Sequence, residues 1–127
     1  MNACPQTVVF ADDSPRVIAV ACSLLFPTYN VINFATNADE AVSSILKLKP
    51  DLAVLDVCMR MDGIAAARKL NQAGTQTRVV LVTQIEDEDY IHEARLIAHG
   101  YVLKRRLLSD LLPALISAST GSFFLSH

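Results

Sequence analysis

The stretch LAVLDVCMRMDG, residues 52–63, joins an apolar run directly to the carboxylate of Asp56. An uninterrupted apolar run of this kind is typical of a strand that helices cover on both faces of its sheet. A carboxylate at the end of such a strand is costly to bury unless a cation or hydrogen-bond donors pair with it. Partners for Asp56 are therefore expected at the ends of the other strands.

Strand-length apolar segments alternate along the chain with segments of helical spacing. The expected strands are residues 7–11, 30–35, 51–56, 77–83 and 100–104. Helix start signals lie between them: Ser14 before Pro15, Asn37 with Glu40, and the acidic block 86–89, while Gly74 follows the third helix and Pro113 falls within a fifth helix at 109–119. This alternation predicts an α/β fold with a parallel sheet and right-handed crossovers.

Length and composition indicate one folded domain. The chain has 127 residues, 52% of them hydrophobic, and a formal net charge of −2. The one basic cluster, Lys104–Arg106, is too short to follow a phosphate backbone, so direct nucleic-acid binding by this segment is not expected. Cys4, Cys22 and Cys58 show no disulfide or zinc spacing, and there is no secretion signal or membrane-length apolar run. A bacterial cytoplasmic location without a membrane partner is expected.

Polar side chains follow four of the five expected strands. Asp12 and Asp13 end the first strand, Asp56 the third, Thr83 the fourth and Lys104 the fifth. The carboxyl ends of parallel strands meet at one edge of a sheet, where ligands bind. The sequence therefore predicts one site that contains all five residues.

The chemistry of these residues favours phosphoryl transfer with magnesium. Carboxylates within about 5 Å of each other repel by roughly 3 kcal/mol per pair at an effective dielectric constant of 20. They need a cation, and carboxylate oxygens suit Mg²⁺. Lys104 supplies a positive charge and Thr83 a hydroxyl group, which leaves Asp56 as the nucleophile that forms an acyl phosphate.

Four segments in this order carry a family resemblance. FADDS (10–14), AVLDVCMRMDG (53–63), LVT (81–83) and GYVLK (100–104) resemble the motifs of the response regulator receiver domain of bacterial two-component systems. The resemblance implies a flavodoxin-like, doubly wound sheet of five parallel strands in the order 2-1-3-4-5 with five helices. It covers residues 1–119 as the receiver domain. Residues 120–127 are then a tail or the start of a linker.

The resemblance also implies the roles of the metal-binding residues. Asp13 and Asp56 would bind Mg²⁺ directly, together with the backbone carbonyl of Cys58. Asp12 would act mainly through water. Asp56 would accept a phosphoryl group from a sensor histidine kinase.

By the same resemblance, three residues report the modification. Thr83 and Lys104 would contact the phosphoryl group, and Tyr101 would change rotamer when Thr83 moves. The surface of the fourth helix, fifth strand and fifth helix would then change to regulate an output, with a homodimer as a further form. The chain would catalyse only its own phosphotransfer and dephosphorylation rather than act as an enzyme on other substrates.

The end of the chain resembles one subfamily. GYVLKRR (100–106) and GSFFLS (121–126) are similar to receivers that precede a LuxR-type (NarL/FixJ) helix-turn-helix output domain. That output domain is absent from this sequence. DNA binding and transcriptional regulation would then depend on it, while the target genes and the cognate kinase are not encoded in this segment.

Three positions depart from the usual receiver pattern. Arg60 and Arg105 stand where proline is common, so a cis bond after Lys104 is not expected. Gln84 is bulkier than the usual small residue beside Thr83 and affects the expected rates of phosphorylation and hydrolysis.

Three other functions remain to be weighed. A receiver-like interaction module that works without phosphorylation stays open, although it would normally lack an acidic residue, the acceptor or the lysine. An aspartyl phosphohydrolase would need a carboxylate where Cys58 stands, and a nucleotide-binding fold would need glycine after the first strand.

His92 and His99 have no matching ligands and are expected on a solvated face.

Overall fold

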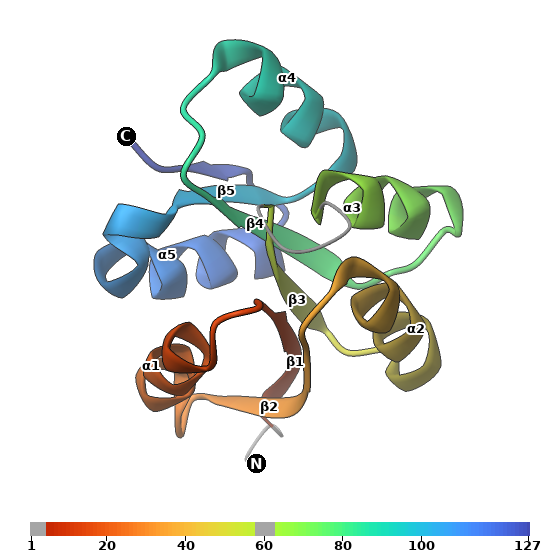
Figure 1. The fold of residues 1–127 in the computed structure, drawn as a ribbon, viewed down its shortest axis with the longest axis vertical. Coiled ribbons are helices and arrows are strands. Elements are labelled where there is room, and N and C mark those ends of the chain that lie inside the picture. The colour runs from red at the N-terminus through yellow and green to blue at the C-terminus, as the bar shows by residue number, and fades with distance from the viewer. Residues whose placement is uncertain (1–4, 58–62) are drawn as a thin grey trace.

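The computed structural model describes residues 5–57 and 63–127 and shows a parallel sheet between helices (Figure 1). Within these residues the sheet has six strands in the order β2-β1-β3-β4-β5-β6. The strands are β1 (Gln6–Ala11), β2 (Tyr29–Ala35), β3 (Leu52–Asp56), β4 (Arg78–Thr83), β5 (Gly100–Leu103) and β6 (Phe124–Leu125). The helices are α1 (Pro15–Leu25), α2 (Ala38–Leu48), α3 (Gly63–Gln72), α4 (Glu88–Ile97) and α5 (Leu107–Ser119), with a 3₁₀ turn at Lys104–Arg106.

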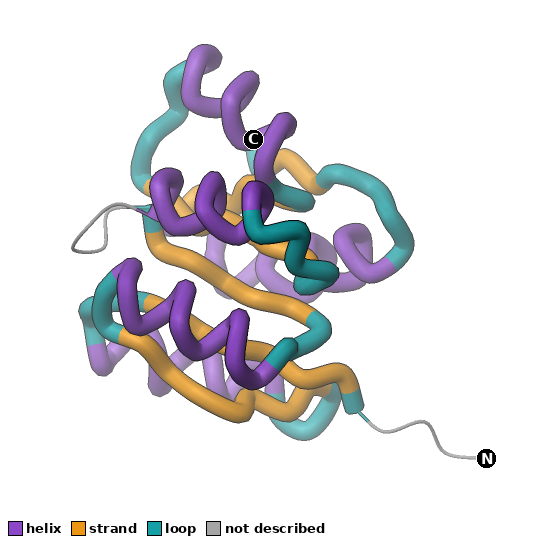
Figure 2. The backbone as a smooth tube through the Cα atoms, turned by 90° about the vertical axis from the view of Figure 1, so that its right-hand side faces the viewer, coloured by secondary structure: helices purple, strands orange, loops and turns teal. Residues whose placement is uncertain are grey.

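The helices form two layers that cover opposite faces of the sheet (Figure 2). α1 and α5 pack on one face, and α2, α3 and α4 pack on the other. In β3, Leu52 and Val54 point toward α1 and α5, whereas Ala53 and Leu55 point toward the other layer. Both sides of the strand are buried, which explains its uninterrupted apolar sequence.

The helix boundaries follow the signals in the sequence. Ser14 Oγ accepts a hydrogen bond from the Val17 amide at 3.4 Å at the start of α1. Asn37 Oδ1 accepts one from the Glu40 amide at 2.9 Å at the start of α2. Gly74 follows α3 with a φ of 72°, a left-handed conformation that glycine adopts without steric cost. Local capping therefore determines where the crossovers return to the sheet.

The doubly wound α/β fold is confirmed, with two differences from the sequence analysis. α5 begins at Leu107, ahead of the expected residue 109, and includes Pro113, which has no amide hydrogen to donate to the preceding turn. The sheet has a sixth strand that was not predicted, because two residues are too few to show a periodic pattern. Among the described helices, none is both long enough and apolar enough to span a membrane.

β6 places the end of the chain beside β5. Gly121 has a φ of 87° and turns the chain back after α5. β6 then pairs in parallel with β5, with Phe124 opposite Gly100 and Leu125 opposite Tyr101. β5 is therefore an inner strand of the sheet, and the surface formed by α4, β5 and α5 includes residues of the C-terminal segment.

His99 differs from the expectation of a solvated side chain. It lies just before β5 and is partly buried, and its Nδ1 accepts a hydrogen bond from the Val79 amide at 3.0 Å. Burial, and then the charge of Arg78, lower the pKa of His99 below its ordinary value. The imidazole is therefore held neutral, because a protonated Nδ1 has no lone pair for Val79. His92 on α4 is exposed, as expected.

This arrangement predicts that the protein loses stability in mild acid. The lowered pKa of His99 means that the unfolded chain binds a proton more readily, so the free energy of unfolding falls as the pH drops below about 6.5. His99→Asn keeps an acceptor for the Val79 amide without titrating and is expected to reduce this loss. Urea unfolding at pH 7.5 and 5.5 measures the effect, with His92→Asn as the matched control. An unchanged pH dependence in His99→Asn would contradict this role.

Candidate functional site

Three carboxylates gather where β1 and β3 end. The two strands pair side by side, with Ala11 opposite Leu55, so the residues that follow lie at one level. The ligand oxygens of Asp12, Asp13 and Asp56 all lie within 4.8 Å of one another. Asp12 and Asp56 are 1% and 2% exposed, whereas Asp13 is open to solvent. The structure therefore brings the predicted carboxylates together, with two of them buried.

Lys104 neutralises part of this charge. It follows β5 directly, and its Nζ lies 3.1 Å from Asp56 Oδ2 and 3.5 Å from Asp12 Oδ2. Burial by itself lowers the pKa of the ammonium group, but the hydrogen bond and charge of Asp56, with a further contribution from Asp12, outweigh burial and raise the pKa above its ordinary value. The lysine is therefore a permanent cation between the two buried carboxylates.

Burial and neighbouring groups together shift the pKa of Asp12. Desolvation raises its pKa, the hydrogen bond from the Ser14 amide at 2.8 Å lowers it, and the negative charge of Asp56 raises it again. The pKa of Asp12 lies above its ordinary value on balance. Independently of this pKa, three carboxylates carry more negative charge than one lysine balances, so a further cation is favourable there.

The donor set fits a magnesium ion. Carboxylate oxygens are hard ligands, and the exposed Asp13 leaves one side of the cluster open to the waters that Mg²⁺ retains. Asp12, Asp13 and Asp56 are the described residues that would hold the ion. The expected fourth ligand, the carbonyl of Cys58, lies outside the described residues, as does Arg60.

The side chains of Thr83 and Tyr101 both form hydrogen bonds with the backbone of Ile85. Thr83 Oγ1 accepts a hydrogen bond from the Ile85 amide at 2.9 Å, and the Tyr101 hydroxyl donates one to the Ile85 carbonyl at 2.6 Å. Both side chains belong to fully buried residues. A cavity of about 140 Å³ adjoins Thr83 and is also lined by Gln84 and Lys104. The site therefore connects to the loop between β4 and α4 through Ile85.

The sequence analysis missed Ile85 and the role of Gly63. Ile85 acts through its backbone, which leaves no mark in the residue type. Gly63 begins α3 so close to β3 that an added Cβ would lie 2.4 Å from the carbonyl oxygen of Asp56. The glycine in MDG was the available signal, since a close backbone approach needs a residue without a side chain.

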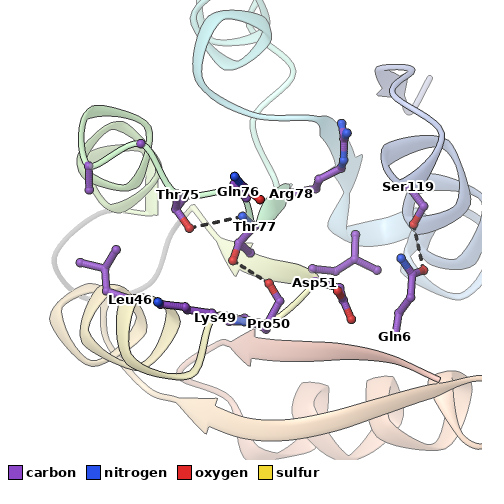
Figure 3. Close-up of a pocket in the computed structure, with 13 residues that line it drawn as sticks. Gln6, Leu46, Lys49, Pro50, Asp51, Thr75, Gln76, Thr77, Arg78 and Ser119 are labelled. Carbon is purple, nitrogen blue, oxygen red and sulfur yellow. Dashed lines mark hydrogen bonds between the residues drawn. The ribbon is translucent and has the colours of Figure 1, made fainter. Parts of the chain in front are cut away.

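A larger cavity, of about 630 Å³, lies at the opposite end of the sheet, where the strands begin (Figure 3). Its wall includes Thr77, which donates a hydrogen bond to the Pro50 carbonyl at 2.7 Å, and Ser119, which donates one to Gln6 at 3.0 Å. None of the predicted site residues that the structure describes lines this cavity. Size alone therefore does not identify the functional site.

The peptide bond between Lys104 and Arg105 is not cis, as the absence of a proline at residue 105 led us to expect. Among the described residues, the cis peptide bond is Phe26–Pro27. Arg105 instead forms an exposed ion pair with Glu86 at 2.8 Å, and both residues line the cavity beside Thr83.

A parallel sheet between helices, with three carboxylates and a lysine at the carboxyl ends of its strands, is the architecture of a signal receiver domain. The chain belongs to the response regulator receiver domain family, whose model matches residues 8–116.

Its relatives are response regulators of the LuxR type. The chain is 31% identical to the nitrate/nitrite response regulator protein NarL of Escherichia coli, over 97% of this chain and 59% of that protein. It thus spans little more than half the length of this curated relative. The NarL signal receiver domain of Mycobacterium tuberculosis matches with a TM-score of 0.85 and 26% identity, over 92% of this chain and 98% of that one. A LuxR-family regulator from Aurantimonas sp. SI85-9A1 gives a TM-score of 0.89 and 26% identity, over 97% and 91%.

The close approach of Gly63 predicts a strong effect of a single methyl group. Gly63→Ala is expected to destabilise the protein by about 1–3 kcal/mol, although alanine favours helices, because the Asp56 backbone must move away from the new Cβ. Urea unfolding at pH 7.5 measures this, and Asn71→Ala, an exposed position on the same helix, is the control. A Gly63→Ala variant as stable as the wild type would refute the proposed packing.

Proposed function

We propose that the chain is a phosphorylation-dependent signalling switch in which Asp56 accepts a phosphoryl group from a sensor histidine kinase. The observation that supports this most directly is the buried Asp56 carboxylate, paired with Lys104 at 3.1 Å beside two further carboxylates. A buried ion pair contributes little net stability, whereas clustered ionisable groups of like charge are characteristic of functional sites.

The transfer follows from the positions of these groups. An Asp56 oxygen attacks the phosphorus atom as the bond from phosphorus to the donor histidine nitrogen breaks, so that histidine leaves and an acyl phosphate forms. Asp12, Asp13, Asp56 and the Cys58 carbonyl would hold Mg²⁺, which supplies charge neutralisation for the incoming phosphoryl oxygens. Lys104 would contact one phosphoryl oxygen from the opposite side.

The response to this modification starts at Thr83. The phosphoryl group carries about 1.5 to 2 negative charges, and the Thr83 hydroxyl would donate a hydrogen bond to one of its oxygens. Because Thr83 and Tyr101 both bind Ile85, a movement of Thr83 would change the constraint on Tyr101. The surface of α4, β5 and α5 would change with them.

The relatives suggest what this surface controls. They are named as response regulators or as members of the LuxR family, so the output would be transcription, through a DNA-binding domain outside this segment. We assign residues 1–119 to the receiver domain and residues 120–127 to a C-terminal tail or the start of a linker. A homodimer is the proposed form that the changed surface would favour.

An interaction module that does not use phosphorylation is the alternative. Gln84 is exposed and lines the cavity beside Thr83 and Lys104, and a side chain of this size there would narrow the approach of a phosphodonor. If this side chain closes the approach, the acidic cluster would serve only to hold the fold. The two functions differ in whether Asp56 can be modified at all.

Intact-mass spectrometry distinguishes them. After incubation with Mg²⁺ and acetyl phosphate, the wild type is expected to gain the mass of one phosphoryl group, because Asp56 is the nucleophile. Asp56→Asn is expected to gain none, whereas Asp39→Asn, an exposed aspartate on α2, should behave as the wild type. Chelation of Mg²⁺ should abolish the adduct. A wild type that gains no phosphoryl group would favour the interaction module.

A further inference from the structure

The two edges of the sheet differ in what covers them. β6 pairs with β5 at one edge, whereas no strand of the described residues lies beyond β2 at the other edge (Figure 1). β2 contains neither a charged residue nor a proline, which commonly keep an exposed edge strand from pairing with another chain. Its Phe34 is 45% exposed. This edge is therefore open to a further strand.

A bulge limits the part of β2 that can pair with a further strand. A shift in the register between β1 and β2 leaves Ile32 as an extra residue in β2, and beyond it the pairing of residues 33–35 with β1 is regular. The Asp12 amide donates a hydrogen bond to the Ala35 carbonyl at 3.0 Å. Because the backbone groups of successive strand residues point to alternate edges, the amide and carbonyl of Phe34 point to the free edge.

A cavity of about 320 Å³ lies beside this edge, where β2 meets α2. Its lining includes the exposed apolar residues Phe34 and Leu48, together with Glu40 and Lys47 of α2. Glu40 and Lys47 are exposed and two helical turns apart, so they lie on the same side of α2, roughly 10 Å from each other along its axis. The cavity thus combines an apolar surface with one acidic and one basic residue.

Neither charge is neutralised within the part of the chain that the structure describes. Glu40 Oε1 accepts hydrogen bonds from the Thr36 hydroxyl at 2.8 Å and from the Asn37 side-chain amide at 2.7 Å, and both donors are neutral. Glu40 and Lys47 belong to none of the ion pairs that the described residues form. This face of α2 is therefore negative at one end and positive at the other.

The middle of this face lies beside Phe34. On α2, the midpoint between Glu40 and Lys47 falls next to Ser44. The Ser44 hydroxyl oxygen accepts a hydrogen bond from Asn33 Nδ2 at 2.8 Å, and Asn33 directly precedes Phe34 in β2. A two-fold axis that passes the free edge at Phe34 would therefore pass the centre of the charged face of α2 as well.

We infer that a second copy of the chain docks on this edge, with β2 of the two copies paired antiparallel around Phe34. The two Phe34 residues lie opposite each other and exchange their backbone hydrogen bonds. The two-fold axis is normal to the joined sheet, so the two α2 helices run antiparallel on the same face. Glu40 of each copy then faces Lys47 of the other copy. This charge complementarity favours a second copy over an unrelated strand.

The docking surface is separate from the surface assigned to the switch. β2 and α2 lie at the edge of the sheet opposite α4, β5 and α5, and they contain none of the predicted site residues. A dimer through β2 would join two sheets into one and leave α4, β5 and α5 of both copies open to other partners. The inference therefore does not rest on the proposed function.

Sedimentation equilibrium of the whole chain tests the inference. The wild type is expected to dimerise with increasing concentration. Lys47→Glu places two pairs of like charges in the interface and should weaken the dimer at least about tenfold. Arg16→Glu makes the same change of charge at an exposed position of α1 and should dimerise as the wild type does. A monomeric wild type, or undiminished dimerisation of Lys47→Glu, would overturn the inference.

A mixture of two variants tests the charge pairing directly. In Glu40→Lys both charged positions of the α2 face are positive, and in Lys47→Glu both are negative, so each variant alone should be mainly monomeric. When the two are mixed, every residue 40 faces an opposite charge at residue 47. The heterodimer is expected to be at least about tenfold tighter than either homodimer. A mixture without a heterodimer would overturn the inference.

A substitution in β2 tests the strand pairing. Phe34→Lys places two ammonium groups opposite each other across the two-fold axis and should weaken the dimer at least about tenfold. Val20→Lys introduces a lysine at a similarly exposed apolar position of α1 and is the matched control, which should dimerise as the wild type does. Urea unfolding of both variants establishes that the monomers are folded. Undiminished dimerisation of Phe34→Lys would overturn the pairing through β2.

Discussion

The Lys104 ammonium group lies between two buried carboxylates, 3.1 Å from Asp56 and 3.5 Å from Asp12. Removing one partner from a buried ion pair typically costs about 3–5 kcal/mol, because the remaining charge has lost both water and its counter-ion. This contact joins β1, β3 and β5 at one edge of the sheet. The pairing is possible only because a parallel sheet brings the carboxyl ends of its strands together.

The same contact leaves the site reactive. Three carboxylates lie beside a single lysine, so an excess of negative charge is left in the cluster. Another cation relieves it, which is why a magnesium site and a phosphoryl acceptor are compatible in one place. Lys104 also begins the 3₁₀ turn that leads into α5, so the charge cluster and the start of this helix are adjacent in the chain.

The features that could be predicted from the sequence are those that depend on hydrophobic periodicity and on residue type. Continuous apolar strands and their polar ends were sufficient to place Asp12, Asp56 and Lys104 together, because strand ends in a parallel sheet have little freedom. The contacts that the sequence did not predict depend on the backbone. Ile85 acts through its amide and carbonyl, and His99 through an acceptor for a distant amide. β6 was missed because its two residues have no pattern, and its position follows from pairing with β5.

Titration calorimetry with Mg²⁺ at pH 7.5 tests most directly whether the carboxylate cluster is a site for a second cation. The account predicts one binding site in the wild type and an affinity at least about tenfold weaker in Asp13→Asn, because Asp13 contributes a ligand oxygen. Asp39→Asn removes an equal charge from the exposed surface of α2 and should bind Mg²⁺ as the wild type does. Equal affinities in the wild type and Asp13→Asn, or no binding to the wild type, would contradict the account.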